Sequence, residues 1–93
     1  MPSKYVFKTT PAFRKALRKL TPREKASAQN AFRVFKDNPF DPRLRTHKVH
    51  GLSAKLGRTI YSVYVESDLR VVFYLTGDCV ISLDIGDHAI YRT

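Results

Sequence analysis

Three histidines and one arginine in a predicted strand are the residues best suited to act on a substrate. His47 and His50 lie before the central strands, and His88 lies near the C-terminal end. Histidine can donate or accept a proton near neutral pH, and the planar guanidinium of Arg70 can bind phosphate. Metal-free RNA cleavage needs a base for the 2′-hydroxyl, an acid for the leaving 5′-oxygen and cations for the phosphate. The sequence contains groups suited to that reaction.

Each of these groups also has an ordinary structural role. A single loop histidine is more often solvated than catalytic, and Tyr91 could simply pack against its neighbours. Arg70 could form an ion pair with Asp84 or Asp87. At the level of sequence these alternatives stay open.

Other kinds of site are disfavoured. The histidines have no regular spacing with cysteine or paired carboxylates, so we expect no metal centre. Gly57-Arg58-Thr59 lacks the lysine of a phosphate-binding loop, and no serine stands in a nucleophile elbow. Cys79 lies in an apolar run and is expected to be a buried, inert thiol. We expect no cofactor.

The charge is strongly basic, with a formal net charge of +9 and a pI near 10.1. The first 25 residues hold eight Lys and Arg against one Glu. Such a surface favours nucleic acid or an acidic protein as partner, although any single charge could belong to a solvated helix face. The exposed helical charges expected to contact RNA are Arg14, Lys15, Arg18 and Lys19.

Length and composition predict one globular domain over residues 1–93. The chain is 43% hydrophobic, and no stretch approaches the roughly 18 apolar residues of a membrane-spanning helix. The N-terminus does not resemble a signal peptide. These features predict a cytoplasmic protein without membrane contact.

Two helices are predicted after a short strand at 4–8. Thr10-Pro11 gives a cap followed by proline at the first helical position. Thr21-Pro22-Arg23-Glu24 repeats the signal and adds a capping box. The second helix should end before Pro39, and the two helices should form a hairpin. We expect Phe13, Leu17, Phe32 and Phe35 to pack on a sheet.

The apolar residues of segment 39–58 follow no regular period. We therefore expect a loop with, at most, a short turn of helix or strand at 43–50. Strands are predicted at 60–65, 69–75 and 80–85. A Gly77-Asp78 hairpin would pair Thr76 with Cys79 and Arg70 with Ile85.

That register sets the two faces of the sheet. Arg70 would share one face with Val72 and Leu83, while Ser82 and Asp84 would lie on the other. The predicted fold class is α+β, in the order β-α-α-β-β-β, with the helical hairpin packed on a small, mainly antiparallel sheet.

This order of elements resembles the RelE/ParE toxin superfamily over nearly the whole chain. The segments that carry the resemblance are Asn38-Pro39-Phe40-Asp41-Pro42, His47-Lys48-Val49-His50-Gly51-Leu52, Leu69-Arg70-Val71-Val72-Phe73-Tyr74 and Ile85-Gly86-Asp87-His88. The resemblance implies either a ribosome-dependent mRNA endonuclease or, in the ParE branch, a poison of DNA gyrase. Because the fold is shared, only the site distinguishes these activities.

The site pattern is most similar to that of the YafQ branch. His47 looks like the first catalytic histidine of that branch, and Asp68 resembles its turn aspartate. His88 looks like the terminal histidine, and Tyr91 looks like the aromatic residue that follows it. The resemblance therefore implies that these four residues take part in cleavage.

Some positions depart from the pattern. Tyr64 stands where the YafQ branch has a second histidine, and a phenol with an ordinary pKa of about 10 is a poor base near pH 7. Either His50 substitutes for that histidine or activity is reduced. Arg70 resembles the arginine that other RelE-type toxins use on the scissile phosphate. Tyr61 and Val63 occupy the places of the RelE lysine pair.

The leading hypothesis is a toxin that cleaves mRNA on the ribosome and inhibits translation. His88 would share the proton transfers with His47 or His50, and Asp68 would orient a histidine or the substrate. Further RNA contacts are expected from Lys48, Tyr64 and Arg92. The expected partners are the ribosome, mRNA and an antitoxin whose acidic or amphipathic segment folds on the basic surface.

Two alternatives remain. The first is a gyrase poison without a nuclease site, which the histidine-containing ending disfavours. The second is a catalytically inactive module that binds an antitoxin or RNA, and Tyr64 supports it. A short acidic reading frame beside the gene would favour a toxin over a solitary module.

Overall fold

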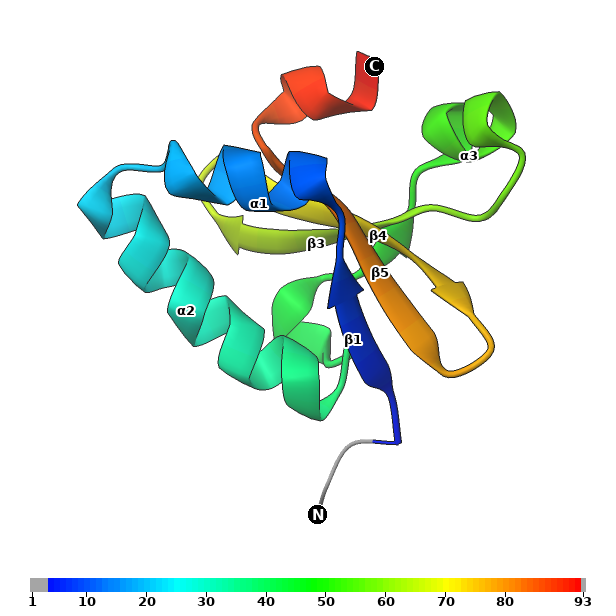
Figure 1. Cartoon of the computed structure of the whole chain (residues 1–93), viewed down its shortest axis with the longest axis horizontal. Helices are drawn as coiled ribbons and strands as arrows, with labels where there is room; N and C mark the ends of the chain where they lie inside the picture. The colour runs from blue at the N-terminus through cyan, green and yellow to red at the C-terminus, as the bar shows by residue number, and fades with distance from the viewer. Residues whose placement is uncertain (1–3, 93) are drawn as a thin grey trace.

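The computed structural model describes residues 4–92, apart from the side chains of His88 and Arg92. Figure 1 shows the arrangement of the elements. Their bounds are β1 Val6–Thr9, α1 Pro11–Arg18, α2 Pro22–Asp37, the 3-10 helix η1 Pro42–Leu44, β2 His47–Lys48, α3 His50–Leu56, β3 Tyr61–Glu66, β4 Leu69–Thr76, β5 Cys79–Gly86 and the 3-10 helix η2 His88–Arg92.

The starts of α1 and α2 follow the sequence signals. The Thr10 hydroxyl accepts a hydrogen bond from the Phe13 amide at 3.1 Å. At α2 the Thr21 hydroxyl accepts from the Glu24 amide, and the Glu24 carboxylate accepts from the Thr21 amide. These bonds satisfy amides that the helix itself leaves unpaired. Helix α2 ends at Asp37, before Asn38-Pro39, as predicted. Residues 19–21 connect it to α1, so the predicted helical hairpin is confirmed (Figure 1).

The five strands form one sheet in the order β1-β5-β4-β3-β2. Strand β1 runs parallel to β5, and every other neighbouring pair is antiparallel. The α+β class and the mainly antiparallel sheet are therefore confirmed. Thr76 pairs with Cys79 across the Gly77-Asp78 turn, as predicted.

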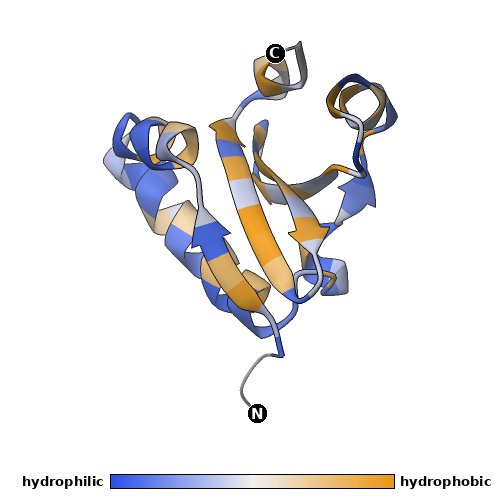
Figure 2. Ribbon diagram, turned by 45° about the vertical axis from the view of Figure 1, so that its right-hand side comes forward, coloured by the Kyte–Doolittle hydropathy of each residue, from blue (hydrophilic) through white to orange (hydrophobic). Residues whose placement is uncertain are grey.

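The main core lies between α1, α2 and one face of the sheet, here called the helical face. Phe13, Phe35 and Phe73 are almost completely buried there. The rings of Phe35 and Phe73 meet edge to face with centroids 5.1 Å apart. Leu17 and Phe32 are half-buried against this cluster, which confirms the packing expected of both helices. Figure 2 shows the strands as the most hydrophobic part of the chain.

The opposite side of the sheet, here called the second face, has a smaller apolar cluster. Leu52 of α3 packs there with Ile60 and Val72, and all three are buried. Ile90 and Tyr91 of η2 pack against the same cluster. The second face is thus partly covered by α3 and η2 rather than by the helical hairpin of α1 and α2.

The prediction that residues 39–58 form mainly a loop is wrong for α3, whereas β2 lies within the stretch 43–50 where a short turn of helix or strand was expected. Helix α3 has only seven residues, too few for a clear apolar period. Tertiary contacts stabilise it instead: Leu52 is buried, and the Ser53 hydroxyl accepts a hydrogen bond from the Ile60 amide at 2.8 Å. Gly57 ends the helix with a φ of 70°, a left-handed conformation that glycine adopts without steric cost.

The predicted pairing of Arg70 with Ile85 is also wrong. An irregularity at Val72/Phe73 shifts the register, so that Arg70 stands opposite Gly86 and Val71 stands opposite Ile85. Asp84 consequently pairs with Val72 on the second face, not on the helical face as expected. The Asp84 carboxylate accepts a hydrogen bond from the Ile85 amide within this irregular stretch.

Cys79 differs from expectation as well. It is half-buried rather than buried, because it is the first residue of β5 after the turn and faces the exposed Thr76. Within residues 4–92, no helix combines the length and the hydropathy needed to cross a membrane.

Candidate functional site

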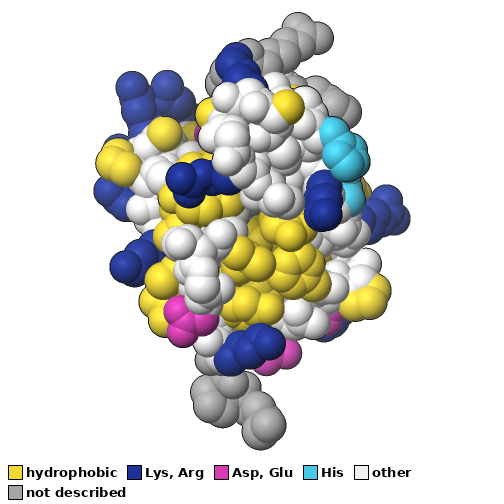
Figure 3. All heavy atoms as spheres, turned by 90° about the vertical axis from the view of Figure 1, so that its right-hand side faces the viewer, with side chains coloured by type: hydrophobic (Ala, Val, Ile, Leu, Met, Phe, Trp, Pro, Cys, Tyr) yellow, Lys and Arg dark blue, Asp and Glu magenta, His cyan; other side chains and the backbone are white. Residues whose placement is uncertain are grey.

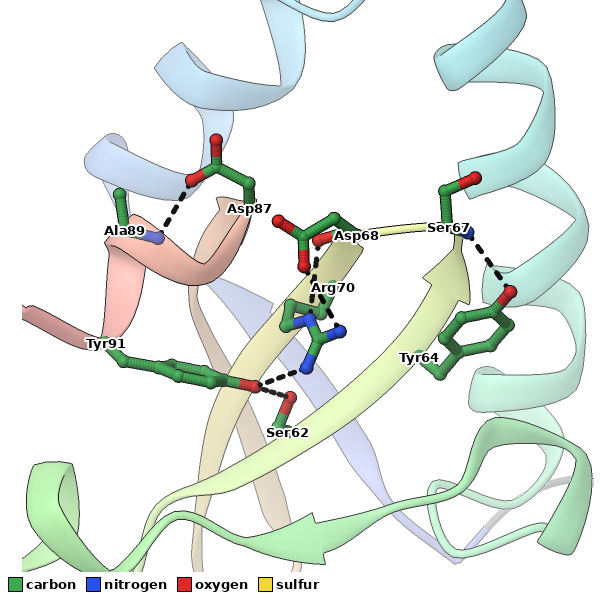
Figure 4. Close-up of polar contacts among 8 residues, drawn as sticks. All are labelled: Ser62, Tyr64, Ser67, Asp68, Arg70, Asp87, Ala89 and Tyr91. Atoms are coloured by element: carbon green, nitrogen blue, oxygen red, sulfur yellow. Dashed lines mark hydrogen bonds and ion pairs between the residues drawn. The ribbon is translucent and has the colours of Figure 1, made fainter.

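Arg70 lies at the centre of a polar network on the second face (Figure 4). Its Nη2 is 3.4 Å from the Asp68 carboxylate, and its Nε donates to the Asp68 carbonyl oxygen. Its Nη1 donates to the Tyr91 hydroxyl at 3.2 Å. The Arg70 side chain is only 18% exposed. These contacts fix the plane of the guanidinium at the edge of a partly buried site.

Tyr91 joins this network to strand β3. Its hydroxyl is 2.6 Å from the hydroxyl of Ser62, and Ser62 is 1% exposed. Its ring packs on the Leu52 cluster. The expectation that Tyr91 packs and the expectation that it takes part in the site are therefore compatible. Ser62 was not predicted, because no local pattern links it to a residue 29 positions away.

A glycine allows Tyr91 to reach this position. A Cβ atom on Gly86 would come within 2.7 Å of the Ile90 side chain, so η2 packs directly on the end of β5. The Asp87 carboxylate accepts a hydrogen bond from the Ala89 amide and stabilises the start of η2. The ion-pair partner of Arg70 is Asp68, and not Asp84 or Asp87, which the sequence also offered as partners. The carboxylates of Asp84 and Asp87 accept hydrogen bonds from the backbone amides of Ile85 and Ala89.

His47 lies on the same face of the sheet as Ser62. The two residues are direct partners in the β2–β3 ladder, so their side chains lie side by side on the second face. The His47 Nδ1 atom is 2.9 Å from the Arg45 carbonyl oxygen. A carbonyl only accepts, so Nδ1 carries the proton and the neutral ring presents Nε2 as the acceptor. This tautomer leaves a basic nitrogen toward solvent.

Tyr64 is the direct partner of Arg70 in the β3–β4 ladder. Its hydroxyl accepts a hydrogen bond from the Ser67 amide at 3.1 Å, and Figure 4 shows it directed away from Arg70. The guanidinium of Arg45 lies 4.8 Å from the centre of the Tyr64 ring. The Tyr64 hydroxyl thus stabilises the turn before Arg70, and the Arg45 guanidinium stacks on the Tyr64 ring.

Other predicted residues lie apart from this network. His50 is the exposed first residue of α3. Lys48 pairs with Tyr61, which places it on the helical face at the sheet edge. The backbones of His88 and Arg92 lie in η2, so His88 follows the Gly86 partner of Arg70 by two residues. The side chains of His88 and Arg92 lie outside the part that the structure describes.

The predicted basic helix residues lie on the other side of the sheet. Arg14, Lys15, Arg18 and Lys19 are exposed on or directly after α1. Helix α1 packs on the helical face, away from Arg70. Arg14 Nη1 donates to the carbonyl and the hydroxyl of Thr9, both at 2.9 Å. These charges form a second basic surface, separate from the site.

From the sequence we expect a cleft that contains His88, Arg70 and Asp68, but the hollow found at Asp68 has a different lining. Asp68 lines a hollow with Leu20, Glu24 and Asp87, and Arg70 is not among its lining residues. Among the described residues, no group of three histidine, cysteine or acidic side chains is arranged to hold a metal ion.

The loop that leads to β2 contains a carboxyl group, that of Asp41, whose pKa is lowered. Hydrogen bonds from the side chain and backbone of Arg43 lower the pKa of Asp41 to about 2. The same contact raises the pKa of Arg43. Asp41 also caps η1, so this pair orders the segment that precedes Arg45 and His47.

Comparison with solved structures reveals extensive similarity in fold. YafQ from Escherichia coli strain BL21(DE3) superposes with a TM-score of 0.74 at 14% identity, over 96% of this chain and 99% of that chain. The archaeal RelE–RelB complex from Pyrococcus horikoshii gives a TM-score of 0.69 at 17% identity, over 90% of this chain and 94% of that chain. The chain has the fold of the RelE and YafQ toxins.

A third similar structure is the RelBE2 toxin–antitoxin complex from Mycobacterium tuberculosis. It has a TM-score of 0.65 at 20% identity and covers 95% of this chain and 100% of that chain. No protein-family model matches the sequence, and no curated protein matches it either. The resemblance to the RelE/ParE superfamily is confirmed at the level of the fold.

Proposed function

We propose that the protein is the toxin of a toxin–antitoxin pair and a metal-independent endoribonuclease. Its substrate would be mRNA bound to the ribosome, and its action would inhibit translation in the cytoplasm. The observation that carries the proposal is the network Ser62–Tyr91–Arg70–Asp68 on the second face, with His47 beside Ser62. It combines a phosphate-binding cation with a histidine that has an exposed basic nitrogen.

The proposed reaction uses the 2′-hydroxyl of the RNA as the nucleophile. His47 Nε2 removes its proton while O2′ bonds to phosphorus, and the bond from phosphorus to O5′ breaks. His88 protonates the leaving O5′, so one strand ends in a 2′,3′-cyclic phosphate and the other in a 5′-hydroxyl. Arg70 stabilises the negative charge of the phosphate in the transition state.

Other residues would position these groups. Tyr91 and Asp68 hold the Arg70 guanidinium from two sides, so that it meets the phosphate in one orientation. The Arg45 carbonyl sets the tautomer of His47. His50 remains an alternative base, since it is exposed at the end of β2.

The deciding experiment is induction of the protein in cells without its partner. Growth, mRNA integrity and DNA supercoiling should be followed together. We expect arrested growth and cleaved mRNA. His88→Ala and Arg70→Ala should both reduce cleavage, and loss of a general acid or base lowers a rate by about 10²–10⁴-fold.

The outcomes separate the alternatives. Changed supercoiling with intact mRNA would indicate that the protein is a gyrase poison and not a nuclease. Normal growth with intact mRNA would support an inactive binding module. Arg33→Ala removes an exposed arginine from α2 and is the matched control, because it lies outside the network.

The proposed antitoxin would bind the basic helical side. Phe32 lines three neighbouring hollows along α1 and α2. The basic residues around them are Lys8, Arg18, Lys25, Arg33 and Lys36. An amphipathic helix with acidic edges would complement this surface, with its apolar side against Phe32. Toxin–antitoxin complexes among the similar structures support the existence of such a partner.

A further inference from the structure

Two arginines near the site stack on tyrosines instead of forming ion pairs. Arg45 lies 4.8 Å from the Tyr64 ring centre, and Arg58 lies 4.2 Å from that of Tyr74. Neither arginine pairs with a carboxylate of the described residues, although Arg23, Arg43 and Arg70 do. Both are exposed. Stacking thus holds each guanidinium in place while its charge stays available to a ligand.

The two stacked pairs lie on the second face, in two different directions from Arg70. Tyr64 is the cross-strand partner of Arg70, so Arg45 flanks it toward β2. Tyr74 lies four residues further along β4, on the same face and roughly 13 Å away at ~3.3 Å per residue. The three arginines therefore lie at the corners of a triangle on the second face, since Tyr64 lies across the sheet from Arg70 and Tyr74 lies along β4.

The surface near these arginines suits an unpaired nucleic-acid strand. Figure 3 shows the side of the molecule away from α2, where an apolar area has Lys and Arg side chains around it, Asp and Glu side chains at its lower edge and histidine at its upper margin. Single-stranded nucleic acids bind such surfaces by stacking their bases on planar side chains while cations follow the backbone. A guanidinium fixed on a tyrosine presents a flat face for a base and N–H groups for a phosphate.

We infer that Arg45 and Arg58 bind the RNA next to the phosphate held by Arg70, each by stacking on a base. This inference rests on the proposed function and assigns the course of its substrate. Arg45 would then act twice, because its carbonyl fixes the tautomer of His47 while its side chain binds RNA. Its backbone is in the left-handed region at a φ of 51°, which turns the chain sharply just before β2.

The test measures binding of a short single-stranded RNA that carries 2′-methoxy groups and cannot be cleaved by attack from O2′. Arg45→Ala and Arg58→Ala should each weaken binding by roughly tenfold, in line with the loss of one stacked base at about 1–3 kcal/mol. Arg45→Lys and Arg58→Lys keep the charge but lose the planar group, so we expect most of the loss to remain. Arg23→Ala is the control and should change affinity less than twofold, because Arg23 is an exposed arginine of α2 whose partner is Glu66.

A second RNA with abasic nucleotides next to the central phosphate separates stacking from charge. Wild type should bind it about as weakly as the alanine variants bind the normal RNA. Equal losses in Arg23→Ala, or full affinity in the lysine variants, would overturn the inference. Cellular mRNA cleavage by wild type alongside unchanged RNA binding by both alanine variants would also overturn it, with the proposed nuclease intact. Intact mRNA in cells that express wild type would remove the proposed function itself.

Discussion

The two faces of the sheet are built by different kinds of interaction. On the helical face, Phe35 and Phe73 belong to a large apolar core between the sheet and two well-capped helices. On the second face, the smaller Leu52 cluster supports a polar network that joins β3, β4 and η2. The comparison indicates that the helical face provides most of the stability, while the second face provides the geometry of the site.

The largest effect is expected from a cavity on the helical face. Phe73 is fully buried, and its ring meets those of Phe35, Phe40 and Tyr61. Phe73→Ala should lower the free energy of unfolding by about 3–5 kcal/mol, measured by urea denaturation. Phe40→Ala is the comparison variant. Phe40 is 38% exposed, so this substitution should lower the free energy of unfolding by less. Equal losses would show that burial does not decide stability on this face.

A smaller effect is expected from the hydroxyl pair on the second face. Tyr91→Phe removes a partner of the buried Ser62 hydroxyl and should cost about 1–2 kcal/mol. Ser62→Ala should have a cost of similar size. The double variant should cost less than the sum, because it leaves neither hydroxyl without a partner. Additive losses in a denaturation cycle would argue against a direct bond between the two groups.

Cleavage should respond differently from stability in these variants. Tyr91→Phe also removes the hydrogen bond to Arg70, whereas Ser62→Ala leaves that bond in place. We therefore expect mRNA cleavage to fall further in Tyr91→Phe than in Ser62→Ala at similar stability. Similar cleavage in both variants would show that Tyr91 does not position Arg70.

The basic surface of the helical side should contribute charge to ribosome binding and little to the stability of the fold. Neutral replacements of Arg14, Lys15, Arg18 and Lys19 should weaken ribosome association, since each phosphate contact releases counterions. Sedimentation with ribosomes at about 50 and 200 mM salt should show a steep loss of binding in wild type and a shallower one in the variant. Exposed substitutions change stability by about ±0.5 kcal/mol each, so the fold should persist. Binding that does not change with salt would assign these charges to another partner.

The difference between the two faces explains which parts of the structure could be predicted from the sequence. Caps, proline stops and hairpin turns are local signals, and they predicted α1, α2 and the three long strands correctly. The second face depends on contacts between distant segments. Helix α3 is stabilised by Leu52 and Ser53 through contacts with the β3 region, so its own sequence shows little periodicity.

The candidate site was predicted only in part, for the same physical reason. Arg70 was proposed from its residue type and Tyr91 from the family resemblance, but the residue opposite Arg70 depends on a register shift that hairpin counting does not detect. Ser62 and Arg45 were missed because their roles come from cross-strand neighbours. Local patterns thus predict the elements, whereas irregularities in the sheet decide which side chains meet.

The smallest expected effect concerns the loop that leads into the second face. Arg43 holds the pKa of Asp41 near 2, below its ordinary value of 3.8. A depressed carboxyl pKa contributes stability that is fully present above the ordinary value and is lost as the pH falls toward 2. Arg43→Ala should move the pKa of Asp41 back toward 3.8, measured by the carboxyl carbon shift in an NMR titration. Arg45→Ala should leave it unchanged, because Arg43, and not Arg45, bonds to this carboxylate. If Arg43→Ala leaves the pKa near 2, the backbone amide bond alone stabilises the charged form, and the order of this loop does not depend on the ion pair.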